Sequence, residues 1–428
     1  DESVVDFLLG KYNKVKQAML VKIEVSSHSD AYVLFESLNN RGTPLTAIDL
    51  MKNLIMAKAE GNNLTIDDCF NRWQTLLGNL SEDYSIQERF FRQYYNAFKH
   101  RLNEPFQSDA DRKKDPLGVV ATRSNLLNIF ESLINKDLPS FLDDILQCGQ
   151  IYSWLILQDT IENPYRKALE DLDHIQGAPS YLLLMYLMRN QEELAVSEEQ
   201  INLIIRLLAK YFVRRNITDY PNTRDLTRIF MDIISKLEEA QATGDKVVSM
   251  IIDILSTPTN CASDEQFRRS LEGDVYKDNV GATRYILCKL AEAAMTQETW
   301  TDLWRRTDKK VFVWTIEHIF PEGQNIPESW VNMIADGDKE LAKQYLEEYT
   351  HKIGNLTITG YNSTLGNKSF EEKRDRKSKD GQRFIGYKNG LDINCEIATM
   401  DKWTVDDIKT RTATLVDELM KVYKFPGE

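Results

Sequence analysis

Two neighbouring residues, Glu317 and His318, have side chains suited to hydrolytic chemistry. They lie in the stretch TIEHIFP, after an apolar run at 311–314, and together these residues predict a strand that ends at His318. The chain has only five histidines. A neutral imidazole can accept a proton from water near pH 7. A carboxylate oxygen is a ligand that hard divalent cations prefer. The pair therefore indicates a hydrolytic centre.

More polar residues follow about thirty positions later, in the stretch HKIGNLTITGYN. It contains His351, a turn at Gly354-Asn355, a predicted strand at Leu356–Thr359, and Asn362. We expect Asn362 to cap a short helical turn, since asparagine is a favoured N-cap residue. Downstream, Gly366 is expected to close that turn, and Ser369 with Glu372 predicts a capping box for the next helix.

The resulting order is strand, histidine, loop, strand and asparagine-capped helix, which is the layout of a ββα-metal (HNH) nuclease. Phosphodiester hydrolysis needs a base, here His318, and a cation that offsets charge on the phosphate. Mg²⁺ or Mn²⁺ could take oxygen ligands from Glu317 and Asn362. Neighbours on a strand point to opposite faces. Glu317 and His318 can therefore share a site only if the chain twists where the strand ends, which Pro321 allows.

The motifs EHIFP, GNLTI, YN and NK at about 310–420 resemble the HNH pattern of the GmrSD family of modification-dependent (type IV) restriction endonucleases. The resemblance implies that His318 is the general base and that Glu317 or Asn362, or both, face the metal. It also implies that Asn355 ties the histidine-bearing loop and that Lys368 contacts phosphate. His351 is a candidate to assist the site, with a backbone hydrogen bond in the hairpin as its alternative role. The nearby basic residues are further candidates for nucleic-acid binding: Lys373, Arg374 and Arg376.

Two other segments are similar to the same family. The stretch VLFESLNNRGTPLTAIDLMKN at 33–53 resembles the end of its ParB-like NTPase domain, and residues 211–226 resemble its helical segment. The family's Asp-Gly-Gln-Gln-Arg signature is absent from the sequence. We therefore expect NTP use only in a complete protein with the missing N-terminal part, and residue 1 is not expected to be the natural start.

Composition sets limits on partners. The net charge is −13, which argues against a wholly basic nucleic-acid coat, yet residues 351–390 hold nine Lys/Arg against four Asp/Glu. DNA contact should therefore be local. The five cysteines are scattered, with no CxxC pair, which favours a reducing, cytoplasmic setting. The clean apolar stretch at 181–188 is too short to span a membrane. Oligomeric state stays open, a homo-oligomer included.

Hydrophobic spacing predicts a mainly α protein with a large helical body and a C-terminal HNH domain. We expect three regions: a remnant of the NTPase-type domain at 1–61, a helical domain at 62–290 and the nuclease at 291–428. Strand-like alternation appears at 19–25. Thr46 with Asp49 predicts a capping box, and apolar residues at 201–212 and 226–237 recur at helical spacing. Polar breaks at 104–118 and 256–265 indicate surface loops.

Other functions fit the same residues. A glutamate beside a histidine is usually an ordinary pair, Asn362 could be only a cap, and the basic run at 373–383 could be a solvated face. A helical module that binds nucleic acid or a partner without cutting is one alternative. An RNA-directed nuclease is another, because the HNH layout does not select the sugar. The predicted function is a metal-dependent endonuclease that acts against modified foreign DNA.

Overall fold

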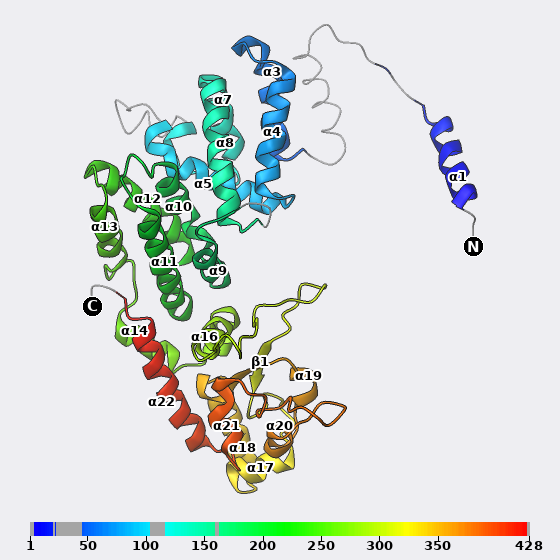
Figure 1. The fold of residues 1–428 in the computed structure, drawn as a ribbon, viewed down its shortest axis with the longest axis vertical. Helices are drawn as coiled ribbons and strands as arrows, with labels where there is room; N and C mark the ends of the chain where they lie inside the picture. Colours follow the sequence, from blue (N-terminus) through cyan, green and yellow to red (C-terminus); the bar gives the residue numbers. More distant parts are fainter. Residues whose placement is uncertain (1–3, 20–21, 23–44, 103–115, 159–161, 426–428) are drawn as a thin grey trace. The chain divides into compact units, whose positions relative to one another are not determined.

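The structure is a computed structural model that describes residues 4–19, 22, 45–102, 116–158 and 162–425 (Figure 1). Several sequence predictions lie wholly or partly outside these residues: the strand at 19–25, most of the loop at 104–118, and the first part of the 33–53 resemblance. The chain forms two compact units. The first comprises Asp1–Arg92 and Leu102–Gly149, and the second comprises Gln93–Arg101 and Gln150–Glu428. The three-region division of the sequence stays a prediction.

Helices dominate both units, which confirms the mainly α fold class. All three unit boundaries fall inside helices, two in α5 (Tyr84–Leu102) and one in α8 (Leu138–Leu155). Thr46 and Asp49 form the predicted capping box at the start of α3. In the first unit the rings of Trp73, Phe91 and Phe130 pack together in the core. Its remaining elements are α1 (Val4–Gln17), α3 (Ala47–Lys58), η1 (Glu60–Asn62), α4 (Ile66–Leu80), η2 (Pro116–Gly118) and α7 (Leu126–Lys136).

The helical part of the second unit has the predicted apolar faces. The residues expected from 201–212 lie in α11 and those from 226–237 lie in α12, with their apolar side chains buried. The predicted break at 256–265 separates α13 from α14. The elements are α9 (Arg166–His174), η3 (Ala178–Ser180), α10 (Tyr181–Arg189), α11 (Glu198–Thr218), α12 (Thr223–Glu239), α13 (Asp245–Leu255), α14 (Asp264–Leu271), α15 (Val275–Asp278) and α16 (Val280–Ala293).

Two antiparallel strands carry the residues singled out in the sequence. β1 (Thr315–His318) pairs with β2 (Leu356–Thr359), and His318 lies opposite Leu356. β2 has the predicted bounds. The prediction of a strand at 311–314 is wrong: Phe312 instead bridges Arg306 in a separate hairpin, and the chain bends before β1 begins.

Short helices surround the two strands, whose residues are all buried except the half-buried Thr315. Phe320, Trp330, Phe370 and Trp403 form the centre of this core, with the Phe370 and Trp403 rings stacked. None of the described helices is long and apolar enough to cross a membrane. The remaining elements are α17 (Glu328–Ala335), α18 (Lys339–Tyr349), η4 (Ile353–Asn355), α19 (Asn362–Leu365), α20 (Phe370–Arg374), η5 (Asp392–Asn394), α21 (Cys395–Thr399) and α22 (Val405–Val422).

Candidate active site

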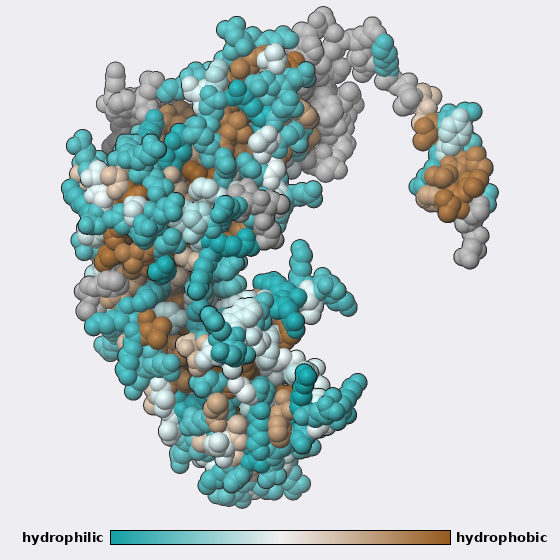
Figure 2. All heavy atoms as spheres, in the orientation of Figure 1, coloured by the Kyte–Doolittle hydropathy of each residue, from teal (hydrophilic) through white to brown (hydrophobic). Residues whose placement is uncertain are grey.

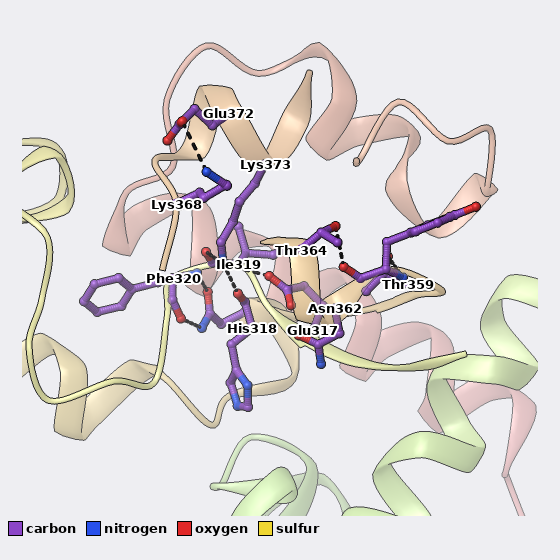
Figure 3. Close-up of polar contacts among 12 residues, drawn as sticks. Glu317, His318, Ile319, Phe320, Thr359, Asn362, Thr364, Lys368, Glu372 and Lys373 are labelled. Atoms are coloured by element: carbon purple, nitrogen blue, oxygen red, sulfur yellow. Dashed lines mark hydrogen bonds and ion pairs between the residues drawn. The ribbon is translucent and has the colours of Figure 1, made fainter. Parts of the chain in front are cut away.

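Glu317 and His318 lie on opposite sides of β1. The carboxylate of Glu317 contacts the ammonium of Lys373, with Oε1 and Nζ 2.7 Å apart. Figure 3 shows the imidazole of His318 directed away from that pair. The structure therefore does not bring Glu317 and His318 into one site, because regular strand alternation continues to His318. Pro321 follows too late to redirect either side chain.

Lys373 is fully buried and binds three oxygen atoms. Besides Glu317, its Nζ donates to the carbonyl oxygens of His318, at 2.7 Å, and of Ile319, at 3.2 Å. Burial raises the pKa of Glu317 and lowers that of Lys373, and each partner's charge opposes these shifts. Lys373 thus fixes the backbone that carries His318, and its ammonium faces protein oxygens in place of the predicted phosphate contact.

The imidazole of His318 lies in a second cluster, with Glu322 and His351. One ligand atom from each residue lies within 4.8 Å of the other two. Nε2 of His318 is 3.7 Å from Oε2 of Glu322 and has no hydrogen-bond partner among the described residues. Nδ1 of His351 is likewise buried without a partner in the described part of the chain. The ligand atoms of two imidazoles and one carboxylate thus lie close together, and one nitrogen of each imidazole has no partner among the described residues.

Burial keeps the His318 imidazole neutral. It lowers the pKa of His318 to about 3, and the neighbouring His351 and Lys373 add to this shift. Tyr276, on α15, contacts both rings: its centroid is 4.5 Å from that of His318 and 5.5 Å from that of His351. A neutral imidazole with an unused nitrogen can accept a proton or bind a metal ion.

Asn355 is fully buried and joins three segments. Its Oδ1 accepts hydrogen bonds from the backbone N–H of Phe320 and the indole N–H of Trp403, at 2.8 and 3.1 Å. Its Nδ2 donates to the carbonyl oxygens of Phe320 and Thr350. These contacts are the tie that the sequence predicted between Asn355 and the histidine-bearing segment. An effect of Asn355 on catalysis stays a prediction.

Asn362 does not cap its helix as expected. It is the first residue of α19, after the N-cap Tyr361, and its Nδ2 donates to the carbonyl oxygen of Ile316 at 2.7 Å. Asn362 therefore attaches α19 to β1, and its amide oxygen is not used in that contact. Gly366 ends α19 with φ of 44°, and Ser369 with Glu372 forms the predicted capping box.

The predicted phosphate-binding residues other than Lys373 remain nearer the surface. Lys368 lies 3.6 Å from Glu372 across one helical turn. Arg374 is paired with Asp375 and Asp401 and donates to the carbonyl oxygen of Met400. Arg376 is half-buried. Lys368 and Arg374 are thus both paired with carboxylates, whereas Arg376 has no carboxylate partner among the described residues.

Glu322 is the residue that sequence reasoning missed. It follows His318 by four positions, beyond Pro321, and its exposed carboxylate reaches back to the imidazole. The spacing His-x-x-Pro-Glu was visible, but no regular element connects the two residues. A loop that folds back was needed to bring them together.

The comparison with known proteins agrees with this part of the structure. Residues 261–418 match the family described as GmrSD restriction endonucleases, C-terminal domain. No curated protein matches the chain. The matched residues include both strands, Tyr276, and the cluster of His318, Glu322 and His351. Over residues 261–418 the chain is therefore similar to the C-terminal domain of the GmrSD restriction endonucleases.

Proposed function

We propose that this chain is a metal-dependent endonuclease that hydrolyses DNA phosphodiester bonds at the His318 side of β1. The observation that carries the proposal is the Nε2 atom of His318. It is buried and neutral, it has no hydrogen-bond partner among the described residues, and it faces Glu322 and His351. Burying such a nitrogen without a hydrogen-bond partner costs free energy, because the atom loses its hydration. Binding of a proton or a metal ion at this nitrogen would offset that cost.

The residues present fit a divalent cation. His318, Glu322 and His351 would hold it, since their donor atoms lie within 4.8 Å of one another and two of the nitrogens are otherwise unused. A bound ion would offset the negative charge that grows on the phosphate during hydrolysis. Two imidazoles and one carboxylate suit Mn²⁺ better than Mg²⁺, which prefers oxygen ligands. We therefore propose Mn²⁺ as the better of the two expected cofactors.

A second ligand set remains a proposal from the sequence. In it, Glu317 and Asn362 hold the metal and His318 accepts the proton of the attacking water. The contact between Glu317 and Lys373 weighs against it, because an ion would have to displace a buried ammonium. Both arrangements need His318, neutral and fixed in place through Lys373 and Asn355. They differ in which residue binds the metal: Glu322 in the first arrangement and Asn362 in the second.

We propose DNA as the substrate because the matched family consists of restriction endonucleases. The modified foreign form of that DNA is part of the same proposal. Cleavage should be tested on matched modified DNA, plain DNA and RNA duplexes, with Mn²⁺ or Mg²⁺. We expect the parent chain to nick or cut DNA, EDTA to stop it, and His318→Ala to lower the rate at least a hundredfold. His100→Ala, in the helical body, is the matched histidine control and should keep the parent rate.

Cleavage by His318→Ala at the parent rate would refute the site. DNA binding without any cleavage, with or without metal, would favour the non-catalytic module. Preferential cleavage of the RNA duplex would favour the RNA-directed nuclease.

A further inference from the structure

A basic β-hairpin at residues 305–313 stands directly before β1. Its legs are joined by hydrogen bonds from the Val313 N–H to the Arg305 carbonyl and from the Thr307 N–H to the Val311 carbonyl. The hairpin holds four exposed basic residues and one exposed acidic residue: Arg305, Arg306, Lys309, Lys310 and Asp308. Arg305, Lys309 and Lys310 form no ion pair with a described residue. Three cations are thus held in solvent without a carboxylate partner in the described part of the chain.

The base of this hairpin is firmly anchored. The guanidinium carbon of Arg284 lies over the Phe312 ring, 3.6 Å from the centroid of that ring. Arg284, on α16, also donates to the carbonyl oxygens of Leu303 and Trp314, the residues that flank the hairpin. The hairpin is therefore a fixed projection, and its second leg leads within two residues to the strand that carries His318.

A second basic hairpin, at residues 376–385, has the same composition. Lys377 bridges Phe384, and the Ser378 N–H donates to the Arg383 carbonyl. Its charged residues are again four basic and one acidic: Arg376, Lys377, Lys379, Arg383 and Asp380. Lys377, Lys379 and Arg383 are exposed and, among the described residues, unpaired by any carboxylate.

This second hairpin is also joined to the site. The N–H groups of Ile385 and Gly386 donate to the Arg376 carbonyl, and the Tyr387 N–H donates to the Lys373 carbonyl. A Cβ at Gly386 would collide with that same carbonyl, so the chain passes closely here. Its root therefore packs on α20, whose Lys373 holds the backbone of His318.

Within the second unit, the two hairpins project to the same side as α19 (Figure 1). Figure 2 shows hydrophilic projections at these places with a recess between them. Exposed cations without carboxylate partners are the groups that neutralise DNA phosphates, and the major groove admits a two-stranded β-ribbon. In a chain of net charge −13, six cations that gather on two ribbons and have no carboxylate partner among the described residues favour a polyanion as partner.

We propose that the hairpins at 305–313 and 376–385 are a pair of cationic arms that hold a DNA duplex by its phosphates beside β1, the strand that carries His318. This inference rests on the proposed nuclease function and adds how the substrate is held. A duplex that spans both arms would present its backbone to the recess between them. Lys368 lies in the chain between β2 and the second arm and would contact the same backbone.

The test is DNA binding measured apart from cleavage. It uses the His318→Ala chain in EDTA with an unmodified 20-base-pair duplex across a salt series. One variant carries Arg305→Gln, Lys309→Gln and Lys310→Gln, and another carries Lys377→Gln, Lys379→Gln and Arg383→Gln. Each should weaken binding at least tenfold at low salt. Each should also lower the slope of log K against log salt by about 2 to 3, since each phosphate contact contributes roughly 0.9.

The matched control removes three exposed cations from α11 and α12, with Arg206→Gln, Lys210→Gln and Arg224→Gln. It should bind with the parent's affinity and slope. Equal losses in the control, or a loss in one arm alone, would overturn the two-arm inference. Tighter binding of an RNA duplex than of the DNA duplex would also overturn it. So would a His318→Ala chain, with both arms intact, that binds no duplex. Because no cleavage is needed, failure of the nuclease proposal would show separately, in the His318 experiment.

Discussion

At the scale of single residues, the candidate metal ligands depend on which carboxylates already have an ion-pair partner within the protein. Glu317 and Glu322 differ in the group that each carboxylate faces and in their exposure to solvent. Glu317 faces the buried ammonium of Lys373, whereas Glu322 reaches a histidine nitrogen that has no described partner. Removing one member of a buried ion pair costs about 3–5 kcal/mol, so Glu317 is held strongly where it lies. Glu322 is half-exposed and free to accept an ion.

This contrast predicts how metal dependence responds to substitution. Glu322→Gln should raise the Mn²⁺ concentration for half-maximal cleavage at least tenfold and weaken Mn²⁺ binding in calorimetry by a similar factor, because a charged ligand is lost. Asn362→Ala should leave both titrations close to those of the parent.

The opposite pattern would assign the metal to the set of Glu317 and Asn362. Mn²⁺ should also support cleavage at a lower concentration than Mg²⁺. If Mg²⁺ is the better cofactor, the nitrogen ligands proposed here are not used.

At the scale of elements, the site depends on how closely η4 approaches α22. Gly354, in η4, accepts no side chain, since a Cβ there would collide with the Ile408 carbonyl and the Thr412 hydroxyl. The Gly354 N–H donates to that hydroxyl, and Arg411 donates to the Gly354 carbonyl. Next to it, Asn355 holds the Phe320 backbone, so a shift of η4 would be passed to the loop after His318.

Gly354→Ala should therefore lower the free energy of unfolding by about 1–3 kcal/mol, the usual cost of overpacking. It should also reduce cleavage, because the His318 loop moves with Asn355. Urea unfolding and cleavage rates measure the two effects. Gly78→Ala is the matched control: nothing lies within 4 Å of its added Cβ, and alanine is favoured in a helix interior. A parent-like Gly354→Ala would show that η4 and α22 are not tightly coupled.

At the scale of the whole molecule, buried histidines connect the site to acid stability. Burial lowers the pKa of His318 to about 3 and that of His174, which stacks on Trp304, to about 4. An unfolded histidine has a pKa of about 6.5, so the unfolded chain binds more protons below that pH. The folded state is therefore fully favoured above about pH 6.5 and loses stability as the pH falls toward the folded pKa values.

For His318 this loss should be about 2 kcal/mol between pH 7 and pH 5. Urea unfolding in EDTA at the two pH values should show a smaller difference for His318→Gln than for the parent, by roughly that amount. His174→Gln should reduce the difference as well, and the two effects should add because the sites share no partner. The same pH difference in all three proteins would mean that neither imidazole is kept neutral by folding.

The sequence by itself determined most of the local structure. Helical spacing predicted the buried faces of α11 and α12, and the capping boxes at Thr46 and Ser369 mark helix starts that the structure has. The bounds of β2 were predicted to the residue. These features depend on neighbours within a few positions, where periodicity and capping hydrogen bonds are visible in the sequence. The motifs around His318 also identified the family domain that the comparison found.

Tertiary structure alone decided which side chains meet. Strand alternation separated Glu317 from His318, and α20 supplied Lys373, fifty-six positions further along the chain, as the ion-pair partner of Glu317. The loop after Pro321 returned Glu322 to His318, while His351 arrived from the end of α18. Such convergence depends on long-range packing around Asn355 and Trp403. Residue types and short spacings cannot encode it, because the same motif would fit a chain that folded the loop away.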